Sequence, residues 1–415
     1  MLTAVKRFAF IMTKNYLFKL ENTIQNYAWG SKTALQSLFG IENAEQQPQA
    51  EIWMGAHPNG CSKVQCADGV HLLSELIERN KPDILSPRTA EQFGELPYLF
   101  KVLAAGNALS IQVHPSKAEA ELGFAKEEAL GIDRAHPQRN YRDANHKPEL
   151  VYALTPYQAM NGFRRFAEII AFFEQLVAKL RIPKVASLLA QFRAEQTSSG
   201  LEAFFVGILS LEGDEKQQAL DALLTYAHQQ VLNQDSRVEF ALILELAQTY
   251  PGDIGLFAPL MLNVLTLQPG EAMYLDARTP HAYLKGAGLE VMANSDNVLR
   301  AGLTAKHIDV AELARCTLFA EKPKETLLLQ PVVEGNKQSY LVPVPDFAFD
   351  CFLKAEAERI HVESAEIVFA IDADTTVSHP SGEVLLLKKG ESVFIPAFAQ
   401  EYTITSTGRV ARVFN

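Results

Sequence analysis

The sequence contains only four cysteines in 415 residues, and no two of them form a CxxC pair. They are Cys61, Cys66, Cys316 and Cys351. Cysteines this sparse exclude a disulfide framework and are consistent with a reducing cytoplasm. Long apolar runs are also absent. No stretch approaches the roughly 20 residues of a membrane span, so we expect no membrane partner.

Positive charge is in deficit as well. Lysine and arginine number 38 against 49 aspartates and glutamates, which gives a formal net charge of -11. This balance argues against a general nucleic-acid binder, which would need a basic surface. An anionic substrate would instead need a local cationic pocket. The length is sufficient for two or three domains, and the composition is ordinary for a globular protein.

The N-terminal segment MLTAVKRFAFIM has some features of a weak signal sequence. Its apolar part is short, however, and the polar stretch Thr13-Lys14-Asn15 follows at once. It also has no small-residue cleavage site. We therefore expect no export, with translation beginning at Met1 or at Met12.

The pattern of apolar residues changes along the chain. Residues 1–162 contain short apolar or alternating runs such as Tyr98–Leu103, which are typical of strands. Residues 163–251 carry apolar side chains three and four positions apart, which predicts amphipathic helices. The strand pattern returns in residues 252–322 and 323–415. The sequence thus predicts a mainly β protein with an inserted α-helical domain.

Two segments of the β part resemble each other. Pro269–Ala277 and Lys389–Ala397 each contain a Gly-Glu turn, an alternating apolar strand and a second turn. The first continues to His281, whereas the second has Gln400 and Glu401 at the matching place and no histidine. We interpret the pair as tandem β-barrels, of which only the first binds a metal ion.

The segment Ser110–Pro115 has the period of a strand. Ser110, Gln112 and His114 fall on one face, and two apolar residues fall on the other. A polar triplet opposite an apolar pair suits a strand whose polar face lines a cavity.

Two further segments carry polar residues on predicted strands. Pro148 disfavours a helical conformation for Lys147, so Lys147 and Glu149 should lie on one face of an extended stretch. His281 lies on the strand that follows the first Gly-Glu turn.

Together these segments offer a mixed set of metal ligands. Two imidazole nitrogens and two oxygens suit a borderline divalent cation such as zinc, with room for water or substrate. Taken alone, a histidine on a strand is more often only hydrogen-bonded or exposed. The candidate ligands are Gln112, His114, Glu149 and His281.

Five motifs resemble the type I mannose-6-phosphate isomerases (phosphomannose isomerases) of the cupin superfamily. The resemblance covers nearly the whole chain in the family's order, and it is weakest in the helical insert and near the C-terminus. The motifs are Asn26–Gly30, Ala50–Gly55, Ser110–Pro115, His146–Glu149 and Asn297–Thr304.

The resemblance implies tandem cupin, or jelly-roll, β-barrels with an inserted helical domain. Residues 1–162 and 252–322 would form the catalytic cupin domain around the insert at 163–251. Residues 323–415 would form a C-terminal cupin-like domain without metal.

The resemblance also implies a reaction and its cofactor. One Zn²⁺ per chain would be bound by Gln112, His114, Glu149 and His281, with an active-site arginine at Arg300. The implied reaction interconverts mannose 6-phosphate and fructose 6-phosphate through an enediol. We expect a cytoplasmic monomer that acts on this small sugar phosphate.

Such a reaction needs ring opening, removal of the C2 proton and return of a proton to C1. A metal ion and a nearby guanidinium can stabilise the charge that develops on the enediol oxygens. Arg300 could do this or hold the phosphate. Each proton-carrier candidate could equally form a salt bridge at the barrel mouth. These candidates are Lys147, His146, Glu290 and Asp296.

The sequence has no Gly-rich phosphate loop, so a clamp of side chains is expected to hold the phosphate. We interpret His57 as a structural residue of a turn, and both tryptophans as core residues that could also pack near the sugar. The candidates for the clamp are Ser110, Lys101, Lys117 and Arg300.

Two other functions are compatible with a metal-binding barrel, since fold alone does not determine chemistry. An iron-dependent oxygenase usually has two histidines and one carboxylate with open positions, and Gln112 as an extra ligand fits this less well. A sugar-binding protein without catalysis would not need Lys147 or Glu290 around the metal.

Overall fold

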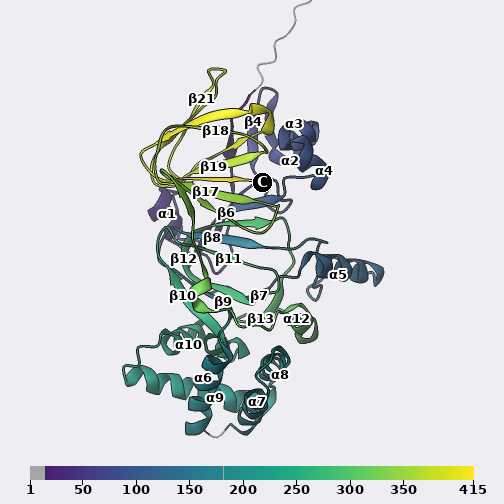
Figure 1. The fold of residues 1–415 in the computed structure, drawn as a ribbon, viewed down its shortest axis with the longest axis vertical. Helices are drawn as coiled ribbons and strands as arrows, with labels where there is room; N and C mark the ends of the chain where they lie inside the picture. Colours follow the sequence, from purple (N-terminus) through teal and green to yellow (C-terminus); the bar gives the residue numbers. More distant parts are fainter. Residues whose placement is uncertain (1–14, 181) are drawn as a thin grey trace, which may run out of the picture.

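The computed structural model describes residues 15–180 and 182–415. The segment MLTAVKRFAFIM and the choice between Met1 and Met12 lie outside these residues. The molecule is elongated, with the helices of the insert at one end and the C-terminal strands at the other (Figure 1). None of the described helices is long and apolar enough to cross a membrane.

The largest sheet has eleven strands, all paired antiparallel. Its main path runs through β14 (Leu328–Leu329), β11 (Ala272–Leu275), β8 (Glu149–Ala153), β12 (His281–Ala293), β6 (Tyr98–Ala105), β3 (Glu51–Met54) and β2 (Thr23–Gln25). Four more strands join this path: β7 (Ile111–Val113), β9 (Tyr157–Phe163), β10 (Leu262–Leu267) and β13 (Leu299–Gly302).

Strand β12 belongs to two layers of this sheet. Its N-terminal half pairs with β7 and β9, and its C-terminal half pairs with β6 and β8. The change occurs at Gly286, whose φ is +116° and where a Cβ would lie 2.4 Å from the carbonyl oxygen of Pro156. Only glycine tolerates both conditions. The bend lets the two layers face a common cavity.

The helical insert follows β9. Pro183 at the start of α7 and Pro251 after α10 mark helix boundaries, as prolines commonly do. The three- and four-residue spacing predicted these helices correctly. They are α6 (Phe166–Lys179), α7 (Pro183–Ala194), α8 (Ser198–Leu209), α9 (Gly213–Leu232) and α10 (Val238–Thr249). Their apolar faces share one core with β9 and β10, which anchors the insert on the sheet.

The expectation of strands and loops throughout residues 1–162 is wrong, because five helices also form there. The longest is α5, where Ser116 and Glu119 form a capping box but only three residues are buried. A helix this exposed has little apolar periodicity to reveal it. Helices and strands take comparable shares of the described chain, so the fold is mixed rather than mainly β. The five are α1 (Ala34–Phe39), α2 (Leu73–Arg79), α3 (Lys81–Leu85), α4 (Pro87–Gln92) and α5 (Lys117–Ala129).

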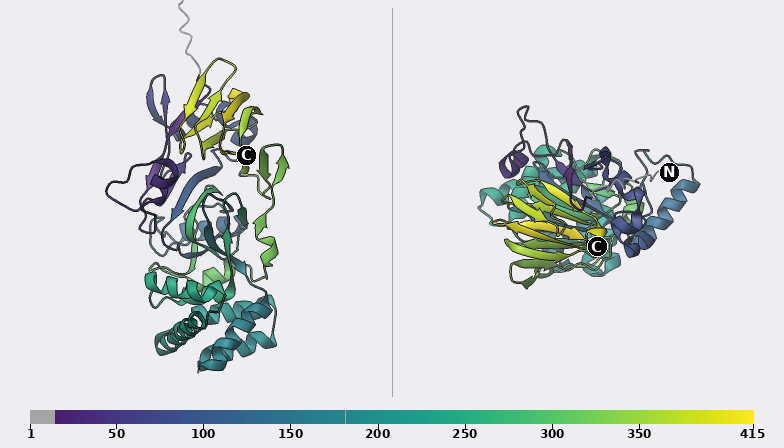
Figure 2. Two further views of the ribbon diagram at one scale, coloured as in Figure 1. Left: turned by 90° about the vertical axis from the view of Figure 1, so that its left-hand side faces the viewer. Right: turned by 90° about the horizontal axis from the view of Figure 1, so that it is seen from above.

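The C-terminal part, together with three strands from residues 18–72, forms two further antiparallel sheets at the end of the molecule opposite the helical insert (Figure 2). Buried side chains such as Val368 and Ile404 form one core cluster of this part. Nine strands form the larger sheet: β15 (Val332–Glu334), β16 (Lys337–Tyr340), β17 (Ala348–Phe352), β24 (Val410–Phe414), β19 (Glu366–Ala370), β22 (Ser392–Ile395), β1 (Phe18–Glu21), β4 (Lys63–Cys66) and β5 (Gly69–Leu72). Four form the smaller: β18 (Ala355–His361), β23 (Glu401–Ser406), β20 (Thr375–Ser378) and β21 (Val384–Leu387).

The two similar sequence segments adopt the same local structure. Gly270 and Gly390 both have positive φ, +95° and +85°, at a tight turn. In each turn the glutamate that follows accepts a hydrogen bond from the backbone three residues earlier, at 2.7 Å for Glu271 and 2.8 Å for Glu391. A buried strand follows each turn, β11 in the first copy and β22 in the second.

Candidate metal centre and active-site cavity

Three buried side chains from separate segments converge in the large sheet: His114, Glu149 and His281. Each offers a ligand atom, and these atoms lie within 4.8 Å of one another. Nε2 of His114 is 3.2 Å from Oε1 of Glu149, and Nε2 of His281 is 3.7 Å from Oε2. Among the described residues no other His, Cys, Asp or Glu group has this geometry.

The hydrogen bonds of the two rings show which nitrogen faces the cluster. Nδ1 of His114 lies 2.7 Å from the carbonyl oxygen of Asn297, and Nδ1 of His281 lies 2.8 Å from that of Thr279. Because a carbonyl only accepts, each Nδ1 carries the proton and each Nε2 presents a lone pair. Both Nε2 atoms are buried without a hydrogen-bond partner. The Nε2 lone pairs and the carboxylate oxygens repel one another unless a cation lies between them. This set of donor atoms therefore fits a zinc ion.

Burial and neighbouring charges favour the protonation states that a metal ion requires. Burial lowers the pKa of His281 to about 4 and, with the charge of Lys147, lowers the pKa of His114. Burial opposes ionisation of Glu149, but the charge of Lys147 holds its pKa well below the usual value. Nζ of Lys147 lies 3.1 Å from Oε1 of Glu149, and the hydroxyl of Tyr283 donates to Oε2. The cluster is therefore neutral at its histidines and anionic at its carboxylate.

Gln112 and Arg300 extend the cluster in a row across three strands. Gln112 on β7 lies opposite His281 on β12 and, on its other side, opposite Arg300 on β13. Residues paired in this way project from the same face of the sheet. Nε2 of Gln112 donates to Oγ of Ser110 at 3.3 Å, and both side chains line the same cavity. Gln112, Glu149 and His281 thus line the cavity, and His114 lies beside Glu149.

The cavity has a volume of about 370 Å³. Its lining also includes Lys101 on β6 and Glu290 on β12, which are cross-strand partners. Nζ of Lys101 lies 2.8 Å from Oε2 of Glu290 and 3.7 Å from Oε1 of Glu51. Burial raises the pKa of Glu290 to about 7, although the charge of Lys101 opposes this. Lys101, predicted as a phosphate ligand, therefore has its charge balanced by two carboxylates.

Asp296 lies at the rim of the cavity beside His57. Nδ1 of His57 accepts from the backbone of Asn59 at 3.2 Å, so Nε2 carries the proton and lies 3.5 Å from Oδ1 of Asp296. Burial lowers the pKa of His57. The interpretation of His57 as a purely structural residue therefore has to be extended. Trp53 also lines the cavity, where its Nε1 donates to Glu51 at 2.6 Å.

Two predicted site residues lie outside the cavity, and those predictions need correction. Nε2 of His146 is 3.1 Å from both carboxylate oxygens of Asp346, because alternation along an extended stretch turns it away from Lys147. Lys117 is exposed at the start of α5, and its Nζ donates to Asn145 at 3.0 Å. Neither side chain lines the cavity.

Two cationic residues of the cavity, Arg142 and Lys306, have no sequence pattern that singles them out. Arg142 lies five positions before Lys147, and Lys306 lies just beyond the Asn297–Thr304 motif. The deficit of positive charge required a cationic pocket somewhere, and both residues adjoin motifs already identified. That proximity is the one signal that could have found them.

The C-terminal part contains a counterpart of the metal centre. Glu366 begins β19 as Glu149 begins β8, and each strand pairs with the strand after the repeated turn. Tyr402 donates to Oε2 of Glu366 at 2.7 Å, as Tyr283 does to Glu149. The tyrosine–glutamate pair is therefore present twice.

A guanidinium lies beside the carboxylate of the second copy. Nε and Nη2 of Arg412 contact the two oxygens of Glu366 at 2.7 and 2.6 Å, and Nη1 contacts Asp350 at 2.9 Å. Glu366 and Asp350 are buried. The positive charge that a metal ion would supply in the first copy is thus supplied by an arginine in the second.

Comparison with known families accounts for most of the chain. Residues 17–166 match the family described as phosphomannose isomerase type I, catalytic domain. Residues 176–262 match its helical insertion domain, and residues 336–415 match the mannose-6-phosphate isomerase cupin domain.

Individual relatives match over almost their whole length. Mannose-6-phosphate isomerase of Escherichia coli is 49% identical over 96% of this chain and 99% of its own. The Bos taurus protein of that name is 36% identical over 93% and 95%. A crystal structure of zinc-bound mannose 6-phosphate isomerase superimposes with a TM-score of 0.89 at 46% identity, covering 97% of this chain and 100% of that one. The chain therefore belongs to the type I phosphomannose isomerase family.

Proposed function

We propose that this chain is a zinc-dependent aldose–ketose isomerase that interconverts D-mannose 6-phosphate and D-fructose 6-phosphate through an enediol. The observation that carries the proposal is the pair of buried, unprotonated Nε2 atoms of His114 and His281 that face Glu149. Glu149 and His281 line a cavity that also contains Glu290, a carboxyl group with a pKa near neutrality. The names of the relatives supply the substrate.

We also propose the domain organisation that the family implies. The two β layers that share β12 would form the catalytic cupin barrel from residues 1–162 and 252–322, around the helical insert at 163–251. Residues 323–415 would form a cupin-like barrel without metal, supported by the repeated turn and by Arg412. The unpaired state of the four cysteines supports a cytoplasmic location.

The zinc ion would be held by Gln112, His114, Glu149 and His281. When bound, the ion supplies Lewis-acid stabilisation of the negative charge that develops on substrate oxygens. The peptide carbonyls at Asn297 and Thr279 keep both rings in the tautomer that binds it. Tyr283 holds the carboxylate of Glu149 in place.

Two groups of the cavity suit transfer of the proton between C2 and C1. Glu290 can accept a proton as a carboxylate and return it as an acid, since its pKa of about 7 favours neither form strongly. The ion pair with Lys101 holds it in place. Lys147 is the second candidate, because its ammonium group lies at the cavity beside Glu149.

A coupled assay tests the proposal directly. Fructose 6-phosphate formed from mannose 6-phosphate is first converted to glucose 6-phosphate. The glucose 6-phosphate is then oxidised by NADP⁺, and the NADPH formed is followed by absorbance. We expect NADPH formation that stops after chelation and returns with Zn²⁺. Consumption of oxygen without NADPH would indicate an oxygenase, and saturable binding of the sugar without turnover would indicate a binding protein.

A further inference from the structure

Three cationic side chains line the cavity in addition to its two lysines: Arg142, Arg300 and Lys306. Within residues 15–180 and 182–415, no carboxylate forms an ion pair with any of them, and their charged groups make no hydrogen bond. Lys101 and Lys147 in the same cavity are each paired with a glutamate. Arg142, Arg300 and Lys306 are therefore the cations available to an anionic ligand.

The three charges also act on one another. Burial and the charge of Arg142 lower the pKa of Arg300. Burial and the charges of Arg300 and Arg142 lower the pKa of Lys306. Like charges held together without counterions destabilise the free protein and favour binding of an anion. The chain as a whole has a net charge of -11, so a local cluster of unpaired cations indicates a binding site for an anionic ligand.

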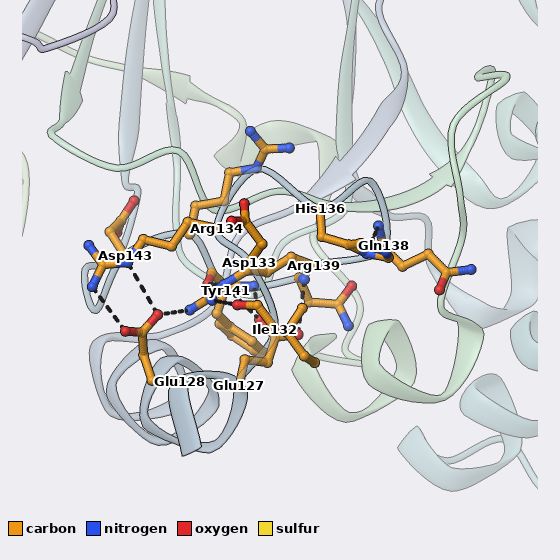
Figure 3. A network of polar contacts seen from close by, with 12 residues as sticks. Glu127, Glu128, Ile132, Asp133, Arg134, His136, Gln138, Arg139, Tyr141 and Asp143 are labelled. Carbon is orange, nitrogen blue, oxygen red and sulfur yellow. Dashed lines mark hydrogen bonds and ion pairs between the residues drawn. The ribbon is translucent and has the colours of Figure 1, made fainter. Parts of the chain in front are cut away.

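The segment before Arg142 is fixed by a network of polar contacts around the buried Arg139, next to α5 (Figure 3). The guanidinium of Arg139 donates to the carbonyl oxygens of Tyr141, at 2.6 Å, and Ile132, and its Nη2 contacts Glu128 at 2.6 Å. The carboxylate of Glu127 accepts from the backbone N–H groups of Asn140 and Tyr141, at 3.0 and 2.8 Å. A loop this well bonded holds the residue that follows it in a defined place.

A second contact ties Arg142 to the metal centre. Its backbone N–H donates to Oδ1 of Asn297 at 2.7 Å. The carbonyl oxygen of Asn297 is the group that accepts from Nδ1 of His114. One residue therefore positions both a metal ligand and the backbone of Arg142, while the guanidinium of Arg142 remains unpaired.

We infer that Arg142 binds the phosphate group of the substrate, next to Arg300 and Lys306, and selects for the phosphorylated sugar. This inference rests on the proposed function. A phosphate monoester is close to a dianion at neutral pH and matches a cluster of several cations. A guanidinium can bind two of its oxygens at once. The metal centre and Glu290 in the same cavity would then act on the reacting carbons.

The test compares Arg142→Ala with Arg134→Ala, a matched control in the same segment whose exposed guanidinium is paired with Glu128. We expect Arg142→Ala to raise KM for mannose 6-phosphate by about 10- to 100-fold, with a smaller change in kcat and full zinc content. The affinity for inorganic phosphate, measured by calorimetry, should weaken for Arg142→Ala and stay unchanged for Arg134→Ala. Arg142→Lys should recover little of the loss, because an ammonium group cannot bind two phosphate oxygens at once.

Two outcomes would overturn the inference. The first is an unchanged KM and unchanged phosphate affinity in Arg142→Ala. The second is loss of zinc or of kcat alone, which would assign Arg142 to the metal centre or the chemistry. Phosphate affinity is measured without turnover. If wild type bound phosphate through Arg142 but did not isomerise mannose 6-phosphate, the proposed function would fail and the phosphate site would stand.

Discussion

Lys101 and Glu290 lie opposite each other on β6 and β12, with Nζ of the lysine 2.8 Å from Oε2 of the glutamate. The pair is buried in the wall of the cavity. Because burial raises the pKa of Glu290 to about 7 while Lys101 opposes that rise, the carboxyl group can exchange its proton near neutral pH.

Glu290→Gln should lower kcat by about 10²- to 10⁴-fold while zinc content is kept, since the amide cannot accept or return a proton. A base acts only when unprotonated, so kcat/KM of the wild type should fall as pH falls through about 7. Glu51→Gln is the control: it removes the other carboxylate near Lys101, whose charge also raises the pKa of Glu290, so the fall should persist but occur at a lower pH. Wild-type kcat in Glu290→Gln would assign proton transfer elsewhere, with Lys147 the next candidate.

His114→Ala and His281→Ala should each lose zinc and activity together while the protein stays folded. The apolar core of the sheets does not depend on a single ligand, so far-UV circular dichroism should be unchanged. Zinc is measured by elemental analysis of the purified variants. Stoichiometric zinc in both variants would refute this ligand assignment.

Tyr283→Phe should weaken zinc binding by about 10- to 100-fold, because the hydroxyl fixes the carboxylate of Glu149. Competition with a chelating dye measures the affinity without reference to activity. Tyr157→Phe is a matched control, since the Tyr157 hydroxyl is buried near Tyr283 but has no hydrogen-bond partner. Equal affinities for the two variants would show that this hydrogen bond does not support the site.

Arg412→Ala should destabilise the protein by about 3–5 kcal/mol, because it leaves Glu366 and Asp350 buried without a counter-charge. Zinc content should remain one ion per chain. Denaturant unfolding measures the loss, and Arg359→Ala, which breaks an exposed pair with Glu401, should cost less than about 1 kcal/mol. An anomalous zinc peak within residues 323–415 of the wild type would contradict the expectation of a metal-free C-terminal part.

Arg300→Ala should lower kcat/KM for mannose 6-phosphate by about 10- to 150-fold, which corresponds to about 1.5–3 kcal/mol for a charge-assisted contact. Arg300→Lys should recover little, because an ammonium group cannot make a two-pronged contact. The comparison of mannose with mannose 6-phosphate in wild type and both variants checks this. Equal efficiency of wild type on both sugars would exclude phosphate as the selected group.

The sequence predicted the parts of the molecule that depend on local patterns. The helical insert follows from three- and four-residue spacing. The strand period placed Ser110, Gln112 and His114 on one face, and Pro148 made the stretch around Glu149 extended. These local features, with the family motifs, identified the residues that the structure brings together at the metal centre.

The contacts that depend on pairing between distant segments could not be predicted. Lys101 has its charge balanced by Glu290 because β6 and β12 lie side by side in a particular register, which no local pattern reveals. His146 turns toward Asp346, a residue of the C-terminal part. Arg142 depends on a network around Arg139 that forms only when α5 and the following loop are in place.

Strand β12 carries His281 at its first residue and Glu290 near its other end, and both line one cavity. A straight strand would hold the two Cα atoms roughly 30 Å apart. The bend at Gly286 shortens that separation, so the spacing between metal ligand and proton carrier is fixed by one continuous piece of backbone. A tilt of the helical insert or of the C-terminal sheets would leave this spacing intact. The separation of His281 and Glu290 therefore does not depend on how the helical insert or the C-terminal sheets are oriented.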